Sequence, residues 1–240
     1  MTKNKTLILM LFIILTFSML FSSSGCENIK DSENYFETEY FMCINAEDKY
    51  CTIFGFTDAG YELEEVVISS EINGLEVAQL GLYFGSNYFT MKEPNMKKIF
   101  IPKGVRLGRA DLFVSCSKLD KVIFLSITPN FKELTNNALP GSIYAPALYL
   151  ENYVDYDYKN IVPADVSFMN NYSDEINGGY YWIDDIDQNQ LIKTVPPEPT
   201  REGYEFCGWC KEAECINQWD FEIDVVYDQN TILYAKWENK

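Results

Sequence analysis

Cysteine is the most reactive residue type in this chain of 240 residues, which has seven cysteines and no histidine. Without imidazole, a Ser-His-Asp or Cys-His catalytic site and a His-bearing zinc site are excluded. Cys207 and Cys210 form a C-x-x-C motif, and Cys215 follows five residues later. A disulfide between Cys210 and Cys215 fits the short intervening turn. Free thiols, and a redox or metal role, stay open as alternatives, although a redox motif needs a helix N-terminus and a zinc site needs a fourth ligand.

A second pair of cysteines, Cys43 and Cys51, stands on either side of the polar segment 45–48. Residues 38–56 alternate in a way that predicts a hairpin with this segment as its turn. The two thiols would then face each other, so a cross-strand disulfide is the prediction, and two free thiols are the alternative.

The acidic segment 184–189 suggests a calcium loop, because it carries three aspartates. Counted from Asp185, an EF-hand needs glycine at position six and glutamate at position twelve. Gln190 and Pro196 occupy these places. We therefore expect a solvated acidic turn, no metal site and no cofactor, and the chain also lacks the glycine motifs that bind phosphate.

The N-terminus indicates export. Lys3 and Lys5 precede an apolar run at 7–21 and small residues at 22–25. The run gives about 22 Å of helix, which is shorter than a hydrocarbon core of about 30 Å. This disfavours the alternative of a membrane-spanning anchor, and residues 1–25 are expected to be a signal peptide.

The sequence Ser24-Gly25-Cys26 resembles the bacterial lipoprotein signal, although Ser23 stands where that signal usually has leucine. The resemblance implies lipidation of Cys26, a polar tether at 26–37, and a place on the extracellular face of the cell membrane. The alternative is a plain signal peptide, with Cys26 in a disulfide.

Four short apolar segments then repeat along the chain, at 66–69, 99–102, 122–125 and 143–146. Their spacings are 33, 23 and 21 residues, with an apparent insertion inside the first. A period of about 20–29 residues is typical of leucine-rich repeats, which contribute one short strand per turn of a solenoid.

The second repeat resembles the BspA-like leucine-rich repeat. Its matching residues are Ile101, Pro102, Val105, Leu107, Gly108, Phe113, Cys116, Leu119 and Val122. The resemblance covers about residues 58–164, and it implies a solenoid domain at 38–165 that begins with the hairpin. Cys116 falls at a core position, where an inert buried thiol is expected.

The middle position of each repeated strand is expected to face outward, because alternate side chains point to opposite sides. This column is unusually apolar and is therefore a candidate ligand-binding surface. Cover by the N-terminal hairpin, or simple strand propensity, are the alternatives. The column consists of Val67, Phe100, Ile123 and Tyr144.

The C-terminal segment resembles the Listeria–Bacteroides repeat, also called the internalin B-repeat. The matching residues are Pro199, Arg201, Gly203, Tyr204, Phe206, Gly208, Trp209, Trp219, Phe221, Leu233, Tyr234, Ala235, Lys236 and Trp237. The resemblance implies a small β-grasp-like domain at 176–240 on a bacterial surface protein, with no catalytic residues. Residues 165–175 are expected to be a polar connection.

These features predict a mainly β protein, with a short solenoid of parallel strands and a small C-terminal domain. The net charge of −17 argues against nucleic acid. We expect a lipid-anchored, monomeric surface protein that binds an extracellular protein or glycan and is not an enzyme. A structural spacer and a secreted thiol–disulfide oxidoreductase are the alternatives.

Overall fold

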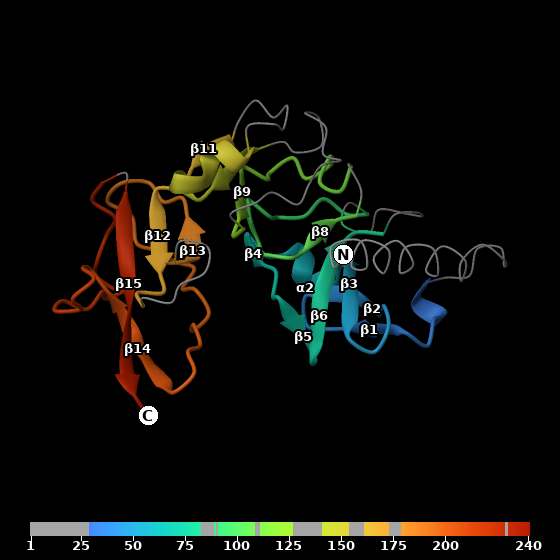
Figure 1. Cartoon of the computed structure of the whole chain (residues 1–240). Coiled ribbons are helices and arrows are strands. Elements are labelled where there is room, and N and C mark those ends of the chain that lie inside the picture. Colours follow the sequence, from blue (N-terminus) through green and yellow to red (C-terminus); the bar gives the residue numbers. More distant parts are fainter. Residues whose placement is uncertain are drawn as a thin grey trace.

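The fold is mainly β in a computed structural model that describes residues 29–82, 89, 91–108, 111–126, 141–153, 161–172, 179–228 and 230–240. Figure 1 shows two units: a blue-to-yellow N-terminal unit, which ends with β11 (Ile161–Pro163), and an orange-to-red C-terminal unit, which begins with β12 (Val166–Met169). The predicted signal peptide and Cys26 lie outside the described residues.

The first sheet contains the predicted hairpin. Its strands follow the order β1 (Tyr35–Glu37), β2 (Phe41–Asn45), β3 (Tyr50–Phe56), β6 (Leu75–Leu80) and β5 (Glu71–Ile72), and β8 (Arg106–Leu107) pairs with β6. The turn between β5 and β6 is the sequence Asn73-Gly74, and both residues have left-handed φ angles, of 53° and 80°. Asn and Gly tolerate this conformation better than other residues, which is why the chain reverses there.

The second sheet is parallel and is built from the repeated segments. Its order is β11, β10 (Ser142–Ala145), β9 (Lys121–Phe124), β7 (Lys98–Ile101) and β4 (Glu65–Val67). Val66, Ile99, Val122 and Ile143 are in register across it. This is the alignment that the sequence repeat predicts, and β11 adds one strand that the repeat did not indicate.

The core of the N-terminal unit lies against one face of this parallel sheet. Alternate residues of β7 and β9, such as Ile99 and Val122, are fully buried in one apolar cluster. Cys116 belongs to the same cluster, and burial raises the pKa of its thiol to about 12, which fits the expected inert core thiol.

The third sheet forms the C-terminal unit, in the order β13 (Tyr180–Asp184), β12, β15 (Thr231–Asn239) and β14 (Tyr204–Cys210). The two central strands, β12 and β15, are parallel, and both edge strands are antiparallel to them. The expected connection at 165–175 is therefore wrong, because it contains the central strand β12. The unit begins there and not at residue 176.

The described helical segments are short: η1 (Ile29–Asp31), α2 (Asp58–Tyr61) and η2 (Ala147–Tyr153). Among the described residues, no helix has the length and apolar character needed to cross a membrane.

Candidate functional site

The outer face of the parallel sheet meets the C-terminal unit. We use "outer face" for the side chains that point away from the N-terminal core, in two columns. The apolar column is Val67, Phe100, Ile123 and Tyr144, and the polar column, two residues earlier on each strand, is Glu65, Lys98, Lys121 and Ser142. Strands β4 and β9 face the orange strand β13 in Figure 1.

The apolar column lies together in register, as the sequence predicts, but it is not a free surface. Phe100 and Ile123 have 0% exposure, and they belong to the same buried cluster as Val166 and Trp182 of the C-terminal unit. The rings of Phe100 and Trp182 are stacked, with centroids 4.8 Å apart and planes 29° apart.

The expectation of a ligand-binding surface on Val67, Phe100, Ile123 and Tyr144 is therefore corrected, because the chain's own C-terminal unit covers them. The cover is not the N-terminal hairpin, whose residues pack into other clusters. Burial of this apolar surface against a second apolar surface is favourable by about 25 cal/mol per Å², so the column stabilises the junction of the two units.

A buried ion pair lies beside the stacked rings. The ammonium of Lys98 donates to Oδ1 of Asp184 at 2.8 Å, and the two side chains are 8% and 0% exposed. Desolvation raises the pKa of Asp184 to about 6, although Lys98 opposes that shift, and the nearby carboxylate of Glu65 adds to it. Among the described residues, Oδ2 of Asp184 has no hydrogen-bond partner.

A second ion pair extends the contact along the polar column. The ammonium of Lys121 lies 2.5 Å from Oδ2 of Asp185 and 3.2 Å from its carbonyl oxygen. On β4, the carboxylate of Glu65 accepts a hydrogen bond from the hydroxyl of Thr194. Each of these contacts joins one unit to the other, so the polar column is also part of the junction.

The acidic segment 184–189 is a solvated turn only in its second half, because residues 187–189 are exposed, whereas Asp184 is buried and Asp185 is partly buried. Asp184 and Asp185 are counter-ions of two lysines on the outer face. Among the described residues, no group of three or more Cys, Asp or Glu side chains is arranged to hold a metal ion.

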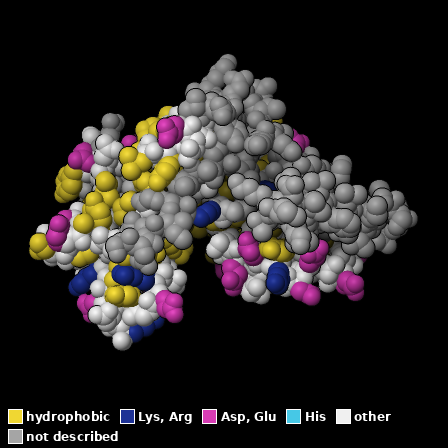
Figure 2. Space-filling model, in the orientation of Figure 1, with side chains coloured by type: hydrophobic (Ala, Val, Ile, Leu, Met, Phe, Trp, Pro, Cys, Tyr) yellow, Lys and Arg dark blue, Asp and Glu magenta, His cyan; other side chains and the backbone are white. Residues whose placement is uncertain are grey.

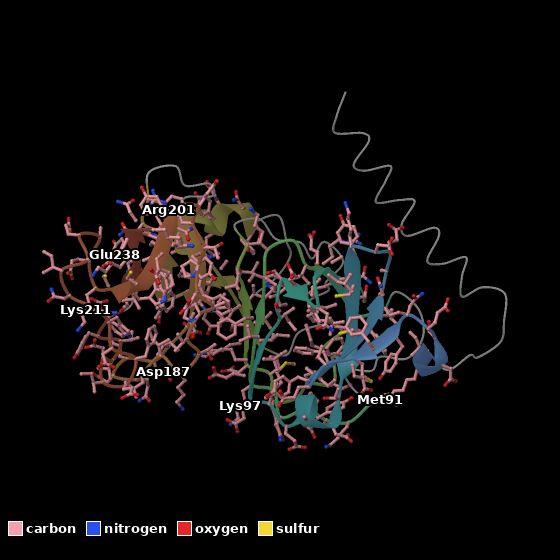
Figure 3. All side chains as sticks on the ribbon, turned by 90° about the horizontal axis from the view of Figure 1, so that it is seen from below. Met91, Lys97, Asp187, Arg201, Lys211 and Glu238 are labelled. Atoms are coloured by element: carbon pink, nitrogen blue, oxygen red, sulfur yellow. The ribbon has the colours of Figure 1, made fainter. Side chains whose placement is uncertain are left out.

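A cleft of about 580 Å³ opens at one edge of the junction, and we call it the junction cleft. Figure 2 shows the two units as two lobes, and Figure 3 shows Lys97 and Asp187 at this edge, one from each unit. Its lining is strongly charged, with acidic and basic side chains in equal number. The lining residues are Glu64, Glu65, Lys97, Lys98, Lys118, Asp120, Lys121, Asp185, Ile186, Asp187, Gln190, Leu191 and Lys193.

Cys43 and Cys51 both have 0% exposure and carry free thiols in the structure. They are not opposite each other: Cys43 pairs with Ile53, and Cys51 pairs with Asn45. The turn is centred later than the sequence suggested, because Glu47 takes a left-handed φ of 72° and Ala46 bonds back to Tyr50. The two cysteines are diagonal neighbours on one face, and their disulfide stays a prediction.

Cys207, Cys210 and Cys215 are also free thiols in the structure. Cys210 is buried at the end of β14, and Cys215 lies on the following loop, partly buried. Burial, followed by a hydrogen-bonding contact with the thiol of Cys215, raises the pKa of Cys210 to about 12. The two residues are neighbours, and their disulfide stays a prediction.

The residues that sequence reasoning missed are Lys98, Lys121 and Trp182, and it did not foresee that Asp184 would form an ion pair. A signal for the lysines was present, because each stands two residues before a member of the apolar column and so must face the same side. The sequence offered no comparable signal that pairs Asp184, 86 residues further on, with Lys98.

Comparison with known proteins identifies one segment of the chain. Residues 165–236 match the family model of the Listeria-Bacteroides repeat domain. The match confirms the resemblance of the C-terminal segment, and it begins one residue before β12.

Three relatives share shorter segments. Internalin H of Listeria monocytogenes is 29% identical over 97 residues, which are 36% of this chain and 18% of that protein. Two proteins of Evansella cellulosilytica, one named as a membrane protein and one as a Gly-rich membrane protein, are 37% identical over 63 residues and 39% over 64. These are 26% and 27% of this chain, but only 9% and 7% of the relatives. The chain thus spans a small part of each relative.

Proposed function

We propose that this chain is a lipid-anchored binding protein of the bacterial cell surface, without catalytic activity. The observation that carries the proposal is the Listeria-Bacteroides repeat domain at residues 165–236, together with the similarity to Internalin H. The apolar segment at 7–21 and the following Ser24-Gly25-Cys26 support export and a lipid at Cys26.

The proposal includes a BspA-like solenoid and a β-grasp-like domain. Support for the solenoid comes from the parallel sheet, in which one strand per repeat stacks in register. Support for the β-grasp-like domain comes from the order β13-β12-β15-β14 with a parallel central pair. Neither architecture specifies a ligand.

We place the ligand site at the junction cleft, since the apolar column is covered. Lys118 of the N-terminal unit and Lys193 and Asp187 of the C-terminal unit are exposed there. A cleft lined by both charges offers donors and acceptors to a polar extracellular protein or glycan, and electrostatic complementarity gives such a contact its specificity. The ligand is therefore expected to be hydrophilic.

A binding screen tests this proposal. The exported chain is applied to an array of glycans and matrix proteins, together with the double variant Lys118→Glu/Lys193→Glu. A ligand held in the junction cleft should lose at least about tenfold in affinity, which is about 1.4 kcal/mol. Lys103→Glu is the control, because Lys103 is also exposed but does not line the cleft. Unchanged binding by the double variant would contradict this placement.

A structural spacer is the second candidate, and the covered outer face favours it. A spacer would bind nothing on the array, whichever variant is used. The thiol–disulfide oxidoreductase is the weaker alternative, because the pKa values of Cys207 and Cys210 are raised and the reactive species is the thiolate. Insulin reduction that depends on Cys207 would restore it.

A further inference from the structure

The end of β14 folds back on itself in a tight loop. Cys210 pairs with Tyr234 of β15, and the chain then turns and returns, so that Cys210 also bridges to Gln218. The amide of Lys211 donates to the carbonyl oxygen of Asn217 at 2.9 Å and closes the base of the loop. The loop therefore leaves β14 and returns beside the same residue.

Cys215 is directed toward this base. Its Sγ lies 3.9 Å from the carbonyl oxygen of Tyr234 and 3.8 Å from that of Ala235. Since Tyr234 is also the strand partner of Cys210, both cysteines lie over the same part of β15. The neighbouring thiol of Cys215 adds to the effect of burial in raising the pKa of Cys210.

A side chain from β12's end holds the loop in this position. The amide nitrogen of Asn171 donates to the carbonyl oxygen of Ala213 at 2.9 Å and to that of Ala235 at 3.1 Å, and it lies 3.8 Å from Sγ of Cys215. Because Asn171 binds both the loop and β15, Cys215 is kept beside Cys210 by contacts that need no covalent bond.

Cys207 is placed differently, although it forms the C-x-x-C motif with Cys210. The pairing of β14 with β15 shifts between Phe206 and Trp209, and Gly208 has a φ of 108°. The thiol of Cys207 contacts the carbonyl oxygen of Glu205 and lies near the carboxylate of Glu238. In the structure, the thiol that neighbours Cys210 is therefore that of Cys215.

We propose that Cys210 and Cys215 are joined by a disulfide once the protein is outside the cytoplasm, and that Cys207 stays a thiol. Exchange with an extracellular disulfide oxidant forms the bond: two S–H bonds break, one Sγ–Sγ bond forms, and two electrons and two protons reduce the oxidant to its dithiol. The bond would fix the loop that presents Ile216, which is 79% exposed.

Peptide mapping of the full exported chain tests the proposal. The protein is denatured in an alkylating reagent without reductant and is then digested with trypsin. Cleavage after Arg201, Lys211 and Lys236 places Cys207 and Cys210 in one peptide and Cys215 in the next. A Cys210–Cys215 bond therefore links the two peptides, with Cys207 alkylated, and reduction separates them.

Two variants complete the test. Cys207→Ser should keep the linked peptides, whereas Cys215→Ser should lose them and show alkylated Cys210. Recovery of Cys215 as an alkylated peptide from the unreduced wild type would overturn the proposal. An internal bond within the first peptide, which would join Cys207 to Cys210, would overturn it as well. The mapping of the wild type does not depend on the folding of either variant.

Discussion

The ammonium of Lys98 and the carboxylate of Asp184, 2.8 Å apart, form a buried ion pair between the two units of the chain. Lys98 stands on the second strand of the parallel sheet, and Asp184 stands at the end of β13. A buried charge without its counter-ion is destabilising, so this pair makes the position of each unit depend on the other.

Loss of the buried cation should destabilise the protein strongly. Lys98→Met leaves the carboxylate of Asp184 buried without its counter-ion, which is expected to cost about 3–5 kcal/mol in the free energy of unfolding. Lys97→Met is the matched control, because Lys97 pairs with Glu64 at 2.7 Å, but both side chains are exposed. That exposed pair should contribute about 0–1 kcal/mol. Urea denaturation measures both, and equal losses would contradict the assigned role of Lys98.

Asp184 should also give the protein a specific dependence on pH. Its pKa is raised from 3.8 to about 6, so the folded state binds more protons than the unfolded state between these values. The stabilising contribution is fully present below about pH 4 and is lost as the pH rises through 6. The total change is on the order of 3 kcal/mol.

A comparison with Asp184→Asn isolates this dependence, because asparagine does not titrate. Unfolding free energies of wild type and variant are measured from pH 3 to pH 8. The difference between them should change through pH 4–6, with the wild type losing stability relative to the variant as pH rises. A difference that stays constant across this range would show that Asp184 does not titrate there.

The stacked rings of Phe100 and Trp182 should be energetically coupled. Each substitution to alanine removes a large buried side chain and is expected to cost about 3–5 kcal/mol. Since the rings contact each other, the double variant should lose less than the sum of the two, by about 0.5–1.5 kcal/mol. Strict additivity in a double-mutant cycle would mean that the two units do not pack as the structure shows.

Membrane association should depend on one residue of the N-terminus. Cys26→Ala removes the thiol that would carry the lipid, and the acidic net charge of the exported body disfavours binding to an anionic membrane surface without it. We expect the wild type to enter the detergent phase in a two-phase separation and the variant to stay in the aqueous phase. Labelling with a radioactive fatty acid is the independent measurement, and labelled Cys26→Ala protein would exclude lipidation at this site.

Much of the fold follows from local pattern. The alternation around Ile99 and Val122 predicts strands, and the repeat predicts that these two residues are in register, because identical segments stack in identical positions. The predicted start of the C-terminal unit, at residue 176, is too late, because the unit begins with β12. The strand β12 is short and pairs in parallel with β15, more than 60 residues away, so no local turn marks it.

The sequence by itself determined which side chains leave the N-terminal core, since strand geometry sends alternate residues to opposite faces. It also determined the identity of the C-terminal repeat. Only the tertiary structure decided what lies beyond the outer face. Phe100 and Trp182, like Lys98 and Asp184, are more than 80 residues apart and meet through packing of two separately built sheets. The alternation of side chains along a strand predicts that Phe100 points outward. It does not indicate whether water, a ligand or another sheet covers the ring.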